Sequence, residues 1–131
     1  MEIYFALVPA LIHVLFFALE SLLWGKRSTN KIFRLNETEA ETVRPFAFNQ
    51  GFYNLFLSIA VFVGAGLKGQ AGKNATQAAY GDALIGYSLA SMFLAGVVLY
   101  LSASHLWRGA VIQAGPAAVA LIPYLINLIS D

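Results

Sequence analysis

Hydrophobic residues fall in four long runs along the chain, and short polar segments separate these runs. They cover residues 3–24, 46–67, 83–107 and 109–129. A helix of roughly 20 mostly apolar residues crosses the hydrocarbon core of a bilayer, which is about 30 Å thick. The pattern therefore predicts four membrane-spanning helices in a single transmembrane domain of residues 1–131.

Residues that break helices agree with these limits. Pro45 lies just before the second run, and a glycine-rich polar segment at 67–73 separates the second run from the third. Trp107-Arg108-Gly109 marks a short turn before the fourth run. Pro116 and Pro123 lie inside the fourth run, where membrane helices tolerate a kink. An acidic segment, residues 37–41, is expected to begin a short helix in the first loop.

The composition agrees with a membrane protein. Hydrophobic residues make up 59% of the chain and charged residues 11%, against about 45–50% and about 25% in ordinary soluble domains. These values exclude a water-soluble monomer and a disordered chain. A net charge of +1 gives no strong basic field, so the expected partner is the lipid bilayer and not nucleic acid. The chain has no cysteine, and no metal or cofactor is expected.

The distribution of Lys and Arg predicts the orientation in the membrane. The loop between the third and fourth runs and the loop after the first run hold six of these cations, whereas the middle loop holds only Lys68 and Lys73. Cytoplasmic loops carry an excess of Lys and Arg. We therefore expect an all-α integral membrane four-helix bundle in the bacterial cytoplasmic (inner) membrane, with both termini on the non-cytoplasmic side.

Polar residues inside the predicted spans are the candidate functional groups. His13 and Glu20 are seven residues apart, which places them on one face of the first helix. Polar side chains also begin the second span and recur in the fourth. A carboxylate at membrane depth needs a partner, a proton or water. We predict a ligand-binding pocket that opens toward the cytoplasm and is centred on Glu20, with these lining residues: Glu20, His13, Asn49, Gln50, Tyr53, Asn54 and Gln113.

A structural role for the same residues is the alternative. Amide and hydroxyl side chains between membrane helices form hydrogen bonds worth about 0.6 kcal/mol each, without any ligand. Trp24 and Trp107 fit the belt of aromatic residues at the membrane interface.

The order of these residues resembles a known family. It begins with His13, Glu20 and Trp24, followed by Phe33. The string Asn-Gln-Gly-Phe-Tyr-Asn-Leu-Phe-Leu follows at 49–57, and Gln-Ala-Gly-Pro-Ala at 113–117. This order is similar to that of the small four-span membrane proteins called domain of unknown function 1304. The resemblance covers nearly the whole chain and implies the fold and the site residues, but no reaction.

Three functions remain open on the sequence. The leading hypothesis is the binding of a small polar or amphipathic molecule, such as a lipid head group, by the pocket around Glu20. The second is proton-coupled export, because small multidrug transporters are also four-span chains with a glutamate in the first helix. The third is a membrane enzyme similar to the glutathione and eicosanoid enzymes. Whether the chain forms a homo-oligomer is also open.

Overall fold

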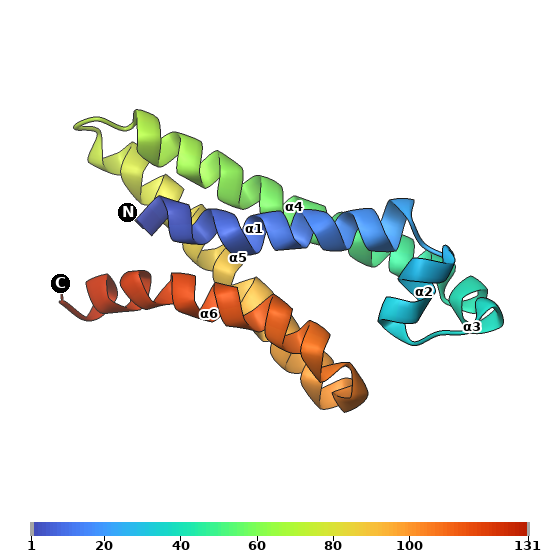
Figure 1. The fold of residues 1–131 in the computed structure, drawn as a ribbon. Coiled ribbons are helices and arrows are strands. Elements are labelled where there is room, and N and C mark those ends of the chain that lie inside the picture. Colours follow the sequence, from blue (N-terminus) through green and yellow to red (C-terminus); the bar gives the residue numbers. More distant parts are fainter. Residues whose placement is uncertain (1, 131) are drawn as a thin grey trace.

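The computed structural model describes residues 2–130, which are helical almost throughout and contain no strand (Figure 1). This confirms the all-α prediction. The elements, in chain order, are α1 (Glu2–Phe17), the π-helical segment η1 (Ala18–Leu22), α2 (Arg27–Phe33), α3 (Glu37–Thr42), α4 (Arg44–Gln70), α5 (Ala75–Ser102), the 3-10 turn η2 (Ser104–Leu106) and α6 (Trp107–Ser130).

Four helical segments of the described chain are long and apolar enough to cross a membrane. They are Ile3–Leu22, Arg44–Gln70, Ala75–Ser102 and Ser104–Ile126. At most 28% of the residues in the most apolar 18-residue stretch of any one of them are buried within the chain, so most of these residues face outward. An outward apolar surface of this extent fits contact with lipid and indicates a multi-pass membrane protein.

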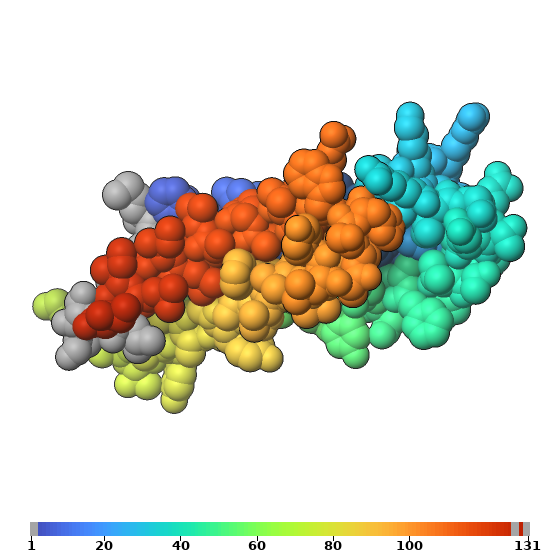
Figure 2. Space-filling view, turned by 90° about the horizontal axis from the view of Figure 1, so that it is seen from below, coloured from blue at the N-terminus to red at the C-terminus, as the bar shows by residue number. Residues whose placement is uncertain are grey.

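The four long helices form a bundle in which neighbours in space follow a simple order. α1 packs against α4 and α6, α4 against α5, and α5 against α6 (Figure 1). The beginning of α1, the end of α6 and the α4–α5 loop lie at one end of the bundle, and α2 and α3 lie at the other. Figure 2 shows α5 and α6 side by side, with the α2–α3 lobe beyond one end of them. Which end faces the cytoplasm stays a prediction.

Small residues let the helices approach closely. A Cβ atom on Gly64 of α4 would lie 2.8 Å from the carbonyl oxygen of Gly81 in α5, and one on Gly81 would lie 2.6 Å from that of Gly64. A Cβ on Gly96 of α5 would lie 2.7 Å from Cβ of Ala114 in α6. Membrane helices associate largely through such close packing. The buried apolar core lies between these contacts and consists of Ala6, Ala10, Val61, Ile85, Leu89, Met92, Ala117 and Ala120.

The third long helix begins before the predicted third span. α5 starts at Ala75, and the turn to α6 lies at residues 103–106, earlier than the predicted turn at Trp107. The earlier start is possible because Asp82 pairs with Lys68 of α4 across the hairpin. The charge of Asp82 therefore does not end the helix. The side chain of Asn74 caps the new helix start by accepting a hydrogen bond from the backbone N–H of Gln77, 3.1 Å away.

The acidic segment of the first loop forms the short helix that its sequence predicts. The Asn36 side chain accepts from the backbone N–H of Glu39 at 2.8 Å, and the Glu39 carboxylate accepts from the backbone N–H of Asn36 at 2.9 Å. This reciprocal pair is a capping box, which fixes the start of α3. The preceding helix α2 ends at Phe33 and is followed by Arg34, whose backbone is left-handed (φ 56°).

Candidate polar site in the bundle

Two polar residues on the first span make hydrogen bonds to two different neighbouring helices. His13 lies opposite Gln113 of α6, and Glu20 lies opposite Asn54 of α4. The seven residues predicted to line one pocket therefore include two separate pairs, at different levels along α1–η1.

The His13 pair is fully enclosed. The His13 ring is 0% exposed, and its Nδ1 donates to the carbonyl oxygen of Pro9 at 2.9 Å. The other ring nitrogen, Nε2, is then the acceptor for the Gln113 amide, whose Nε2 lies 3.5 Å away. Phe16 packs edge-on against the imidazole, with 5.9 Å between the ring centres. Both ring nitrogens are occupied, so this pair joins α1 to α6 and leaves no ring nitrogen of His13 free for a ligand.

Glu20 lies in a π-helical segment at the end of the first span. The backbone N–H of Leu23 donates to the carbonyl oxygen of Ala18, five residues earlier, at 2.9 Å. A π-helical turn holds more residues than an α-helical turn, and such turns occur frequently at functional sites. The turn changes the direction of the side chains that follow it, which accounts for His13 and Glu20 meeting different helices.

The Glu20 carboxylate has one hydrogen-bond donor. Nδ2 of Asn54, a buried residue, donates to Oε2 of Glu20 at 2.7 Å. Oε1 accepts no hydrogen bond within residues 2–130, and no cation of that part of the chain lies within ion-pair distance of Glu20. The side chain is half-buried. A carboxylate at this depth with one amide partner has capacity for a further proton or cation.

A glycine allows α4 to approach the π-helical segment. A Cβ on Gly51 would lie 2.1 Å from Oγ of Ser21 and 3.1 Å from Cβ of Glu20. Oγ of Ser21 donates to the carbonyl oxygen of Phe48, one turn earlier on α4, at 2.9 Å. Only a residue without a side chain fits between these groups. Gly51 therefore sets the distance at which Asn54 meets Glu20.

A cleft of about 340 Å³ opens beside Glu20 at the end of the bundle. Its lining combines a carboxylate, a guanidinium and apolar rings: Glu20, Ser21, Trp24, Arg44, Pro45 and Phe48. Arg44 does not pair with Glu20. Its Nη2 and Nε lie 2.7 Å and 2.8 Å from Oε2 of Glu41, and Nη1 donates to the carbonyl oxygen of Trp24 at 3.3 Å.

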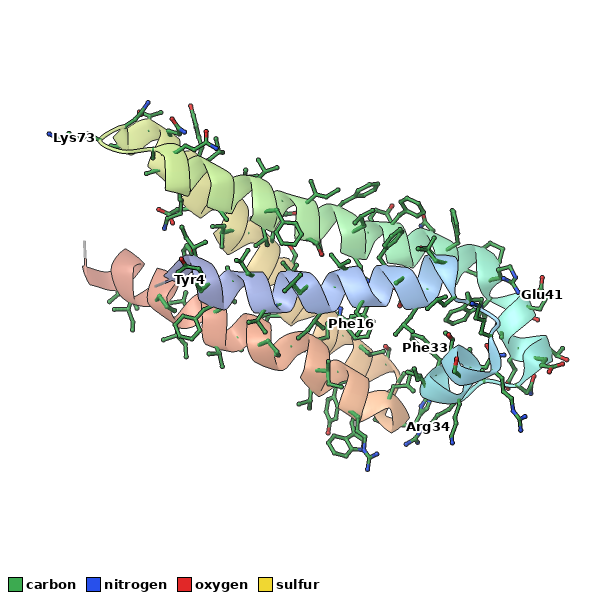
Figure 3. All side chains as sticks on the ribbon, turned by 45° about the horizontal axis from the view of Figure 1, so that its top comes forward. Tyr4, Phe16, Phe33, Arg34, Glu41 and Lys73 are labelled. Carbon is green, nitrogen blue, oxygen red and sulfur yellow. The ribbon has the colours of Figure 1, made fainter. Side chains whose placement is uncertain are left out.

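The loop before α4 holds this side of the cleft in place. Nε1 of Trp24 donates to the carbonyl oxygen of Ala40 at 2.7 Å, and the Trp24 ring packs on Phe33 with 5.0 Å between ring centres. Gly25 has a left-handed backbone (φ +86°), and a Cβ there would lie 2.6 Å from Nη2 of Arg44. Figure 3 shows Phe33 and Glu41 at this end of the molecule, opposite Lys73.

Three of the residues predicted to line a pocket lie on the outer side of α4. Asn49, Gln50 and Tyr53 are exposed, and Tyr53 is 56% exposed. The prediction of site residues in turn left out five residues of the cleft, namely Ser21, Trp24, Arg44, Pro45 and Phe48. The sequence places Trp24 on the same face of the first helix as Glu20 and makes Arg44 one of the cations nearest to Glu20, but it does not show that the three residues line one cleft.

A larger hollow of about 430 Å³ lies on the outside of α3, lined by Glu37, Thr38, Glu41 and Thr42. Its residues come from one short helix and are all exposed, so it lacks the buried polar groups of a binding site. Within the described residues, no three His, Cys, Asp or Glu side chains are grouped in a way that could hold a metal ion.

Comparison with known proteins places the chain beside a family of unknown function. A family model described as "Protein of unknown function (DUF1304)" matches residues 7–125. No curated protein and no solved structure matches the chain.

Proposed function

This chain belongs to the DUF1304 family of unknown function, and we propose from the site itself that it binds a small polar or amphipathic ligand. The ligand would occupy the cleft beside Glu20. The excess of Lys and Arg at this end of the bundle supports an opening toward the cytoplasm. The membrane that we propose for this protein is the bacterial inner membrane.

The environment of the Glu20 carboxylate carries the proposal. A half-buried carboxylate with a single amide donor is costly, because the hydrogen bond replaces only part of the lost hydration. A protein that needed only a structural link between η1 and α4 could use two amides at lower cost. A ligand that supplies a cation or a hydrogen-bond donor to Oε1 would complete the coordination of the carboxylate.

The walls of the cleft support an amphipathic ligand. Trp24, Pro45 and Phe48 provide apolar surface next to the two charged side chains. Binding sites for small molecules commonly combine apolar walls with a few polar groups that fix the orientation of the ligand. Phe48 is 51% exposed, so the apolar wall continues onto the outer surface of α4, where lipid chains would lie.

The test compares two single-charge removals in protein extracted with its surrounding lipid. Wild type, Glu20→Gln and the control Glu37→Gln, which changes an exposed glutamate of α3, are analysed by native mass spectrometry for retained small molecules. We expect wild type and the control to retain the same molecule and Glu20→Gln to lose it, with the helix content unchanged by circular dichroism. Retention by Glu20→Gln, or the absence of any retained molecule in wild type, would contradict the proposal.

Proton-coupled export is a second candidate, and the missing cation partner of Glu20 favours it. A membrane carboxylate without a fixed counter-charge can alternate between a proton and a cationic substrate. The measurement is efflux of a lipophilic cation such as ethidium from proteoliposomes with an imposed pH gradient. Export requires gradient-dependent efflux that Glu20→Gln abolishes, and wild-type liposomes without such efflux would rule it out.

A further inference from the structure

The cleft carries one charge of each sign, and these charges are not paired with each other. Glu20 is held by Asn54, and Arg44 by Glu41 on the outer side. Building on the proposed ligand site, we propose that the ligand is zwitterionic, with an ammonium group that binds Glu20 and a phosphate or carboxylate group that binds Arg44.

The two charges lie at different depths in the cleft. Glu20 packs at the level of Gly51, because a Cβ on Gly51 would lie 3.1 Å from Cβ of Glu20. Arg44 is the first residue of α4, about two helical turns closer to the end of the bundle. The Arg44 side chain is 47% exposed, whereas Glu20 is half-buried. A bound ligand would therefore point its ammonium group inward and its acidic group toward the mouth.

Both charges can accept a ligand group. Oε1 of Glu20 accepts no hydrogen bond within residues 2–130, so an ammonium group can bind there while Asn54 keeps Oε2. Arg44 is paired with Glu41, whose side chain is 68% exposed, and exposed ion pairs of this kind are weak. The acidic group of a ligand can replace Glu41, because guanidinium groups bind phosphate and carboxylate groups in two-point geometry.

The presence of both Glu20 and Arg44 in the cleft also indicates which ligands it would reject. A purely anionic molecule would satisfy Arg44 but bring a like charge toward Glu20. A purely cationic molecule would satisfy Glu20 and repel Arg44. Selectivity through such unmatched charges is common in polar binding sites. The zwitterionic group could belong to an amine-bearing phospholipid or to a soluble amino-phosphate, and the two differ in whether acyl chains contribute to binding.

Trp24 provides a direct readout, because its ring lines the cleft. The chain has two tryptophans, so Trp107→Phe leaves Trp24 as the single reporter. Purified Trp107→Phe protein in detergent micelles is titrated with brominated phosphatidylethanolamine, with brominated phosphatidylglycerol, which lacks the amine, and with a brominated alkylammonium, which lacks the acid. The titration with brominated phosphatidylethanolamine is then repeated in the presence of soluble glycerophosphoethanolamine. This competition distinguishes a lipid ligand from a soluble one.

We expect phosphatidylethanolamine to bind Trp107→Phe protein about tenfold more tightly than either singly charged probe. Adding Glu20→Gln should remove the preference over phosphatidylglycerol, and adding Arg44→Gln should remove the preference over the alkylammonium. Adding Arg27→Gln, which changes an exposed cation outside the cleft, should change neither preference. Competition by glycerophosphoethanolamine at a similar concentration would assign a soluble ligand, and its failure to compete would assign a lipid.

Two other outcomes separate this inference from the proposal on which it rests. If all three probes quench Trp24 equally and this quenching still requires Glu20, the inference of a zwitterionic ligand is wrong, although the proposed ligand site remains. No saturable quenching by any probe, together with no retained molecule in the native mass spectra, would overturn both.

Discussion

Replacing Gly51 with alanine tests whether α4 touches the π-helical segment that carries Glu20. The added Cβ would lie 2.1 Å from Oγ of Ser21 and 3.2 Å from the carbonyl oxygen of Phe17. Real Cβ atoms essentially never approach other atoms more closely than 3.0 Å, so Ser21 must rotate or the helices must separate.

The expected cost follows from three contributions. Overpacking a close contact costs about 1–3 kcal/mol. Rotating Ser21 also breaks its hydrogen bond to Phe48, which is worth about 0.6 kcal/mol in a membrane helix pair. Alanine regains about 0.5–1 kcal/mol over glycine in helix propensity. We expect Gly51→Ala to lower the free energy of unfolding by about 2 kcal/mol.

The same helix offers a matched control. A Cβ on Gly66 would have no atom within 4 Å, so Gly66→Ala should gain the helix propensity alone and be slightly stabilising. Unfolding is followed by circular dichroism as SDS is titrated into mixed micelles. Adding Ser21→Ala to Gly51→Ala removes the hydroxyl that clashes and should recover most of the loss. Equal stability of Gly51→Ala and Gly66→Ala would show that α4 and η1 are not in contact at this point.

Two further predictions concern pairs on either side of the site. Gln113→Leu leaves Nε2 of the buried His13 without a donor and should lower the free energy of unfolding by about 1 kcal/mol in the same SDS titration; an unchanged titration would show that the pair is not formed. The hydrogen bond and charge of Arg44 hold the pKa of Glu41 below its ordinary value. The Arg44–Glu41 pair therefore stabilises the fold at pH values above the ordinary glutamate pKa of about 4.3. This contribution is lost as the pH falls through the lower pKa of Glu41 in the folded protein. Glu41→Gln should lower the melting temperature slightly at pH 7, where the pair is present, and flatten its dependence on pH in that acidic window, where wild type and variant converge. An unaltered acid limb would contradict this.

The sequence predicted the fold well because membrane helices are encoded locally. Four apolar runs of about 20 residues have few ways to satisfy their backbone hydrogen bonds other than as helices. The Asn36-x-x-Glu39 spacing likewise specifies the short helix α3 through its capping box. α5 begins at Ala75, before the predicted span at 83–107, and the sequence alone does not show that Asp82 pairs with Lys68 on another helix.

The candidate site was predictable only in its key residue. Glu20 stands out because a carboxylate within a span is rare and costly. Its partner could not be chosen among the amides of the second span, because the direction of Glu20 depends on the π-helical segment and on the close approach at Gly51. Arg44 lies against Trp24 and Gly25, which are about 20 residues away in the sequence, and the sequence does not predict these contacts.

The links that α1 makes also have a consequence for biogenesis. α1 is synthesised before α6, but the partner of His13 is Gln113 of α6, 100 residues later. At about 5–20 residues per second of synthesis, His13 waits about 5–20 s for that partner. Glu20 waits a shorter time, since Asn54 is 34 residues away. The nascent chain must therefore hold a polar imidazole in the insertion machinery or against lipid until α6 arrives, so the polar contacts of α1 are complete only after α6 has been made.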